Sequence, residues 1–106
     1  MSTTGENSRS IPIERVQIGV RLEQRMVKVL KALAEYVDLS LGDLLEGIVL
    51  HAFEGKAPFS EETVRRIAQL KDIYGMNYGV EASHRMREPL TNSEADKDNR
   101  IGGADA

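Results

Sequence analysis

The part of the chain that most constrains the fold is a short alternating segment followed at once by two amphipathic segments. From Val16 to Leu22, apolar residues alternate with Gln17, Gly19 and Arg21, which is the period of a β-strand with one buried face. A lone strand leaves its backbone N–H and C=O groups unpaired, and no second strand is visible nearby. We therefore expect the partner strand to come from a second copy of the chain.

Two amphipathic helices are expected after this strand. Between residues 24 and 37 apolar residues recur at three- and four-residue steps. Ser40, with Asp43 three positions later, has the pattern of an N-cap, so a second helix should begin at Leu41. The apolar residues of this second helix cover more than one narrow stripe, which indicates burial on two sides. They are Leu41, Leu44, Leu45, Ile48, Val49, Ala52 and Phe53.

A third helix is predicted from Glu61 to about Tyr74. Ser60 resembles another N-cap, and Gly75 is placed to end the helix. Phe59 should pack against the first turn of this helix as a hydrophobic staple, and a short helical turn near residues 80–86 should be packed by Tyr78. The inward face of the third helix is expected to comprise Val64, Ile67, Leu70 and Ile73 or Tyr74.

The length of 106 residues fits one small domain with polar ends. The absence of cysteine excludes disulfides and thiolate sites, and no apolar run approaches the roughly 20 residues that span a bilayer. These features favour a cytoplasmic protein. We divide the chain into a flexible N-terminal arm (1–10), a dimerisation and binding domain (11–55), a C-terminal helical extension (56–87) and a disordered acidic tail (88–106).

The charge of the chain is unevenly distributed. A net charge of -3 argues against nucleic-acid binding, which usually relies on clustered Lys and Arg. Between Arg15 and Lys31, however, five basic residues stand against Glu23 alone, whereas acids dominate from Glu88 onward. The basic charge is therefore local. The alternative interpretation of these basic residues is that they form only the solvated face of a helix.

Residues 16–53 resemble the ribbon-helix-helix family of DNA-binding proteins, of the Arc, MetJ and CopG type. The resemblance lies in IGVRL as the ribbon strand, EQRMVKVLKALAEYVDLS as the first helix and turn, and SLGDLLEGIVLHAF as the second helix. It implies a mainly α fold, a ribbon-helix-helix dimer with an intermolecular two-stranded antiparallel ribbon, plus an additional C-terminal helix. It also implies a homodimeric, sequence-specific protein that binds double-stranded DNA, a transcriptional regulator that lays its ribbon in the major groove.

The resemblance assigns roles to individual residues. Arg can contact guanine and Gln adenine through paired hydrogen bonds, each worth about 1–3 kcal/mol of base discrimination. The base contacts implied are Gln17, Gly19 and Arg21. The phosphate contacts implied are Arg15, Arg25 and Lys28, together with the start of the second helix at Ser40, Leu41 and Gly42. The dimer core implied is Ile18, Val20, Leu22, Leu44 and Ile48.

Departures from the family pattern support an alternative function. Gly19 offers no side chain to read a base, and Leu41 stands where the family often has a basic residue. The alternative is a protein-interaction scaffold or an antitoxin in which residues 56–106 bind a partner protein. Arg21 would then be an edge-strand charge that deters aggregation.

No catalytic motif is present in the sequence. It has no nucleophile elbow, no Gly-rich phosphate loop and no His-rich motif, so we expect neither an enzyme nor a metal or cofactor site. His51 lies near the end of the second helix, where a positive charge is favourable, and this explains it better than a metal ligand does.

Overall fold

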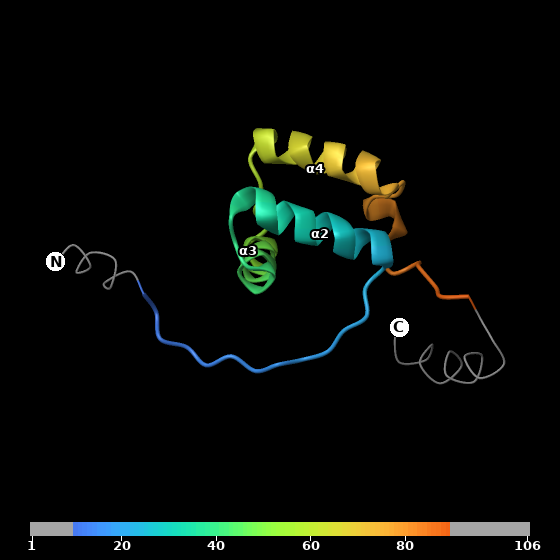
Figure 1. Cartoon of the computed structure of the whole chain (residues 1–106). Coiled ribbons are helices and arrows are strands. Elements are labelled where there is room, and N and C mark those ends of the chain that lie inside the picture. Colours follow the sequence, from blue (N-terminus) through green and yellow to red (C-terminus); the bar gives the residue numbers. More distant parts are fainter. Residues whose placement is uncertain (1–9, 90–106) are drawn as a thin grey trace.

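The computed structural model describes residues 10–89, and within that range the regular structure is helical. The described chain contains the α-helices α2 (Gln24–Val37), α3 (Leu41–Phe53) and α4 (Glu61–Tyr74), followed by the 3-10 turn η1 (Val80–Ala82) (Figure 1). Residues 10–22 run ahead of α2 as an extended segment (Figure 1). Most of the predicted arm and of the predicted acidic tail, residues 1–9 and 90–106, lies outside the described residues.

The predicted strand is not formed within residues 10–89, so the ribbon-helix-helix fold class is wrong for this structure. Residues 16–22 carry no regular secondary structure. Alternating side chains meet one requirement of a strand, but a strand also needs a neighbouring backbone with which to exchange hydrogen bonds. No segment of the described chain pairs with this one. The fold is a unit of α-helices preceded by an extended segment.

The ends of the helices follow the predicted signals. The Ser40 Oγ accepts a hydrogen bond from the Asp43 N–H at 3.1 Å, which confirms the N-cap of α3. The Ser60 Oγ accepts from the Thr63 N–H at 3.2 Å, which confirms the N-cap of α4. Gly75 ends α4 with a φ of 70°, a left-handed conformation that favours glycine because it has no Cβ.

The core is small and centred on α2, against which α3 and α4 both pack (Figure 1). Leu33 and Ala34 of α2 meet Leu44 of α3, and each of the three is 5 % exposed or less. Half-buried apolar side chains surround them, namely Leu30, Val37, Ile48, Phe59, Ile67 and Leu70. A core of this size gives the helices a fixed arrangement while leaving much apolar surface uncovered.

The inward face predicted for α4 is partly wrong. Ile67 and Leu70 pack on the core as expected, but Val64 is 52 % exposed. Of the alternatives Ile73 and Tyr74, the first is 70 % exposed and the second 38 %. Because α4 meets the core through two residues one turn apart, side chains further around the helix point to solvent. No helix among residues 10–89 is both long enough and apolar enough to cross a membrane.

Candidate nucleic-acid interface

The residues predicted to contact bases lie close together on the extended segment, and all are exposed. One nitrogen of the Arg21 guanidinium lies 2.8 Å from the Glu88 Oε2. Both side chains of this ion pair are exposed, and such a pair contributes little and exchanges readily for another anion. A Cβ added at Gly19 would meet no atom within 4 Å, so no close contact in the described chain requires this glycine.

Arg15 joins the extended segment to α3. Its guanidinium donates two hydrogen bonds to Glu46, one from Nε at 2.9 Å and one from a terminal nitrogen at 2.8 Å. The same terminal nitrogen lies 3.8 Å from the Asp43 Oδ1. The hydrogen bond from Arg15 lowers the pKa of the Glu46 carboxyl below its ordinary value. Two carboxylates therefore already face the guanidinium that was predicted to hold a phosphate.

The start of α3 is formed as predicted, but it is acidic. Ser40, Leu41 and Gly42 stand at the end of the helix where free N–H groups and the helix dipole favour an anion. The Asp43 N–H, however, is already bound by the Ser40 Oγ, and the Asp43 and Glu46 side chains are close by. The structure brings Arg15 and this helix start together, and the two acids offset the positive potential there.

Arg25 has a structural role that the sequence did not reveal. Its Nε donates to the Glu23 Oε2 at 2.9 Å, and a terminal nitrogen donates to the Gly75 carbonyl oxygen at 3.1 Å and to the Asn77 Oδ1 at 3.3 Å. The guanidinium carbon also lies 5.5 Å from the centroid of the Tyr78 ring. Arg25 thus ties the start of α2 to the residues beyond α4. Of the basic residues predicted to contact phosphate, Lys28 alone has a side chain that makes no hydrogen bond or ion pair with another described residue, and it is exposed on α2.

Glu23 and Tyr78 form the centre of this contact, which we call the Glu23–Tyr78 junction (Glu23, Arg25, Asn77 and Tyr78). The Tyr78 hydroxyl donates to the Glu23 Oε1 at 2.5 Å, and the same oxygen accepts from the Met26 N–H at 3.1 Å. The hydrogen bond from Tyr78 is the main reason that the pKa of Glu23 falls to about 2. Burial, and after it the bond to Glu23, raises the pKa of Tyr78 to about 12.

The junction carried one weak signal in the sequence. Glu23 stands directly before the first residue of α2, a position where a carboxylate can cap early N–H groups. Its tyrosine partner is 55 positions further along the chain, and no local pattern connects the two. The prediction that Tyr78 packs near a short helical turn identified its neighbourhood but missed the hydrogen bond.

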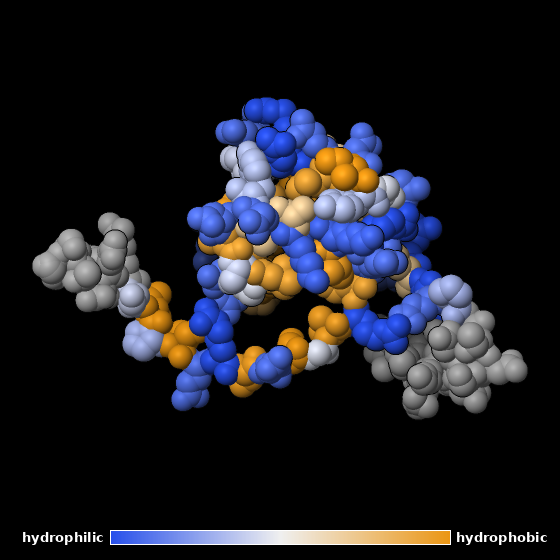
Figure 2. Space-filling view, viewed as in Figure 1, coloured by the Kyte–Doolittle hydropathy of each residue, from blue (hydrophilic) through white to orange (hydrophobic). Residues whose placement is uncertain are grey.

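The residues predicted to form a dimer core fall into two groups. Ile18, Val20 and Leu22 are between 45 % and 75 % exposed on the extended segment, and Figure 2 shows apolar side chains along it outside the helices. Leu44 instead belongs to the core of its own chain, with Ile48 half-buried beside it. The first group is free for a partner, and the second is already used within the chain.

Neither histidine of the described chain belongs to a cluster of three or more potential metal ligands. The His51 Nδ1 lies 2.7 Å from the Gly47 carbonyl oxygen, within its own helix. No group of three or more potential metal ligands among His, Cys, Asp and Glu comes together within residues 10–89.

A scan against protein-family models and searches of curated proteins and of solved structures found no match to the chain.

Proposed function

We propose that the chain is a homodimeric DNA-binding protein, in which a second copy covers the apolar side of the extended segment and DNA contacts its polar side. The observation that carries this proposal is the two-sided character of residues 16–22. Apolar residues alternate with Gln17, Gly19 and Arg21, and both rows are uncovered within the described chain. The proposal does not rely on a β-ribbon.

The exposed apolar surface supports the homodimer. On the segment, Val16 is 83 % exposed, and at the end of α3 Phe53 is 81 % exposed. Ile13 and Leu50 line one pocket and are 57 % and 63 % exposed, and contiguous apolar surface of this kind marks an interaction site. Ile13 of the segment already lines a pocket with Leu45 and Leu50 of α3, so the two surfaces fit each other chemically. In a two-fold dimer, the extended segment of one copy can contact α3 of the other copy, and the symmetry then repeats this contact a second time.

The polar row supports DNA as the ligand. Arg21 and Gln17 are the residue types that bind guanine and adenine edges, and both are exposed. The Arg21 ion pair with Glu88 is exposed at both ends, so a phosphate or a base can replace the carboxylate. Lys28 and Lys31 add positive charge on the exposed side of the adjoining helix. A regulator of transcription acting in the cytoplasm is the role we assign to such a dimer.

The ion pairs of Arg15 favour a second candidate function, a dimer that binds protein rather than DNA. Glu46 holds this guanidinium with two hydrogen bonds, and Asp43 is beside it. Arg25 is likewise held, in the Glu23–Tyr78 junction. With these two cations engaged, the same apolar surface can serve a scaffold or an antitoxin whose partner is another protein.

Titration with duplex DNA of randomised sequence tests the proposal. Affinity should fall steeply between about 50 and 200 mM salt, because binding releases counterions from the phosphates. Arg21→Ala should weaken binding to selected sequences by about 5- to 150-fold, the loss of one good base contact. Arg65→Ala removes an exposed charge on α4 and serves as the matched control.

A flat salt response, or no binding at low salt, overturns the DNA proposal and leaves the protein-binding candidate. The solution mass tests the homodimer separately. Sedimentation equilibrium should give twice the chain mass of 11.8 kDa, and a monomer at all concentrations contradicts both candidates.

A further inference from the structure

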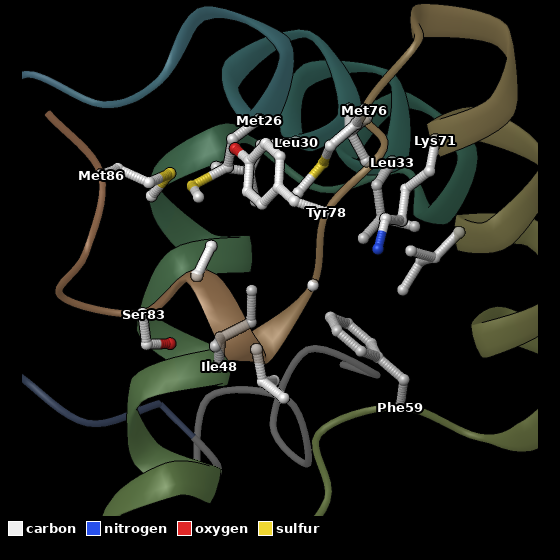
Figure 3. A pocket seen from close by; sticks show the side chains of 15 residues that line it. Met26, Leu30, Leu33, Ile48, Phe59, Lys71, Met76, Tyr78, Ser83 and Met86 are labelled. Atoms are coloured by element: carbon white, nitrogen blue, oxygen red, sulfur yellow. The ribbon is translucent and has the colours of Figure 1, made fainter. Parts of the chain in front are cut away.

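A cavity lies between α2, α4 and the residues beyond α4. It has a volume of about 340 Å³, and residues 76–86 form one of its walls (Figure 3). Small-molecule sites in proteins are concave, mostly apolar and roughly 300–1,000 Å³ in volume. This cavity falls at the lower end of that range, which fits a small ligand.

The lining of the cavity is apolar and adaptable. Met26, Met76 and Met86 all line it, alongside rigid side chains such as Leu30 and Phe59 (Figure 3). Methionine is unbranched and polarizable, so it adjusts its shape to an apolar partner. A cavity lined in this way favours a flexible hydrocarbon chain over a polar ligand.

Lys71 is the one charged side chain in the lining, and Figure 3 shows its Nζ directed toward the cavity. It makes no hydrogen bond or ion pair with another described residue, although Glu81 lies near enough to attract it. The Glu81 Oε2 instead accepts from the Gly79 N–H at 2.8 Å. The Lys71 ammonium is therefore left to bind an anionic group of a ligand.

We propose that this cavity binds a medium-chain fatty acid, with the hydrocarbon chain among the methionines and the carboxylate on the Lys71 Nζ. The ligand surface is built by α2, α4 and residues 76–86, so the site does not depend on the DNA binding proposed above. Tyr78 also lines the cavity, which places the ligand beside the Glu23–Tyr78 junction.

The test is a titration of the full chain with decanoate, monitored by NMR of ¹³C-methyl-labelled methionines. The signals of Met26, Met76 and Met86 should shift with saturation, below the concentration at which decanoate forms micelles. Decanol has the same chain without the charge, and it should bind at least about tenfold more weakly because it lacks a charge-assisted hydrogen bond.

Three variants locate the binding. Lys71→Met keeps an apolar stem but removes the ammonium, so it should reduce decanoate affinity at least about tenfold and leave decanol affinity unchanged. Lys31→Met, on the exposed side of α2, should change neither. Ala82→Phe should fill the cavity and abolish binding of both ligands, with unchanged far-UV circular dichroism as the check on folding.

Three results would overturn the proposal. One is methionine signals that do not respond to decanoate, or that respond to protein concentration instead, because a second copy then fills the cavity. Another is that the wild type binds decanoate and decanol with equal affinity and that Lys71→Met changes neither affinity. The third is full binding by a folded Ala82→Phe variant, which would place the ligand on the outer surface. DNA affinity is measured separately, so failure here leaves the proposed function standing.

Discussion

Replacing Tyr78 with phenylalanine should raise the pKa of Glu23 from about 2 toward its ordinary value of 4.5. The Tyr78 hydroxyl donates to the Glu23 Oε1 at 2.5 Å, and this hydrogen bond is the main cause of the low pKa. The Arg25 Nε and the Met26 N–H remain as donors to the carboxylate in the variant. The pKa should therefore stop short of the ordinary value.

The same substitution should change how stability depends on pH. A carboxyl whose pKa is about 2 in the folded chain and 4.5 when unfolded stabilises the fold above pH 4.5, and this contribution is lost as the pH falls through that interval. A phenol whose pKa is about 12 folded and 10.0 unfolded contributes fully below pH 10.0, and its contribution is lost as the pH rises toward 12. The difference in the free energy of unfolding between wild type and Tyr78→Phe should therefore be constant between pH 4.5 and pH 10.0. It should shrink below pH 4.5 and above pH 10.0.

Two measurements check this prediction. A ¹³C NMR titration of the glutamate carboxyls gives the pKa of Glu23 directly, and urea unfolding at several pH values gives the stability difference. Tyr36→Phe is the matched control, since the Tyr36 hydroxyl makes no hydrogen bond within residues 10–89 and its ring keeps the contact with Arg66 at 4.7 Å. If Glu23 titrates at the same pH in wild type and in Tyr78→Phe, the hydroxyl is not the cause of the low pKa.

Two further predictions concern stability measured by urea unfolding. Leu33→Ala should lower the free energy of unfolding by about 2–5 kcal/mol because it opens a cavity in the core, while Val64→Ala on the exposed side of α4 should stay within about 0.5 kcal/mol. Similar losses for the two variants would contradict a core centred on Leu33. Gly75→Ala should cost about 1–2 kcal/mol because its φ of 70° is strained for a residue with a Cβ. Gly47→Ala inside α3 should instead raise the free energy of unfolding by about 0.5–1 kcal/mol, because a Cβ there meets no atom within 4 Å. A change of the same sign in both glycine variants would contradict this reasoning.

The helices could be predicted from the sequence because their signals are local. Ser40 and Ser60 cap helices whose apolar residues recur at helical spacing, and Gly75 ends the last of them. The face that α4 presents to the core was less predictable. It depends on how two helices meet, and the spacing of Val64 and Ile73 did not distinguish the covered side from the exposed one.

The strand was mispredicted because alternation describes side chains, whereas a strand is defined by backbone pairing. Residues 16–22 have the pattern without a partner in the described chain. The candidate site was limited for a similar reason. Arg15, Arg21 and Arg25 were identified as cations, but the carboxylate partners of the first two, Glu46 and Glu88, lie at distant positions that no local pattern connects. The partner of Arg25, Glu23, is two positions away, and its contact was also missed.

The cap of α2 has a consequence for how the protein is made. Glu23 is synthesised just before the helix that it caps, but the hydroxyl that binds it arrives with Tyr78, 55 residues later. During translation, at about 5–20 residues added per second, the hydrogen bond between Tyr78 and Glu23 can therefore form only seconds after Glu23 has been added. A chain released before Tyr78 would retain the sequence of all three helices and still lack the contact that joins the start of α2 to the segment beyond α4.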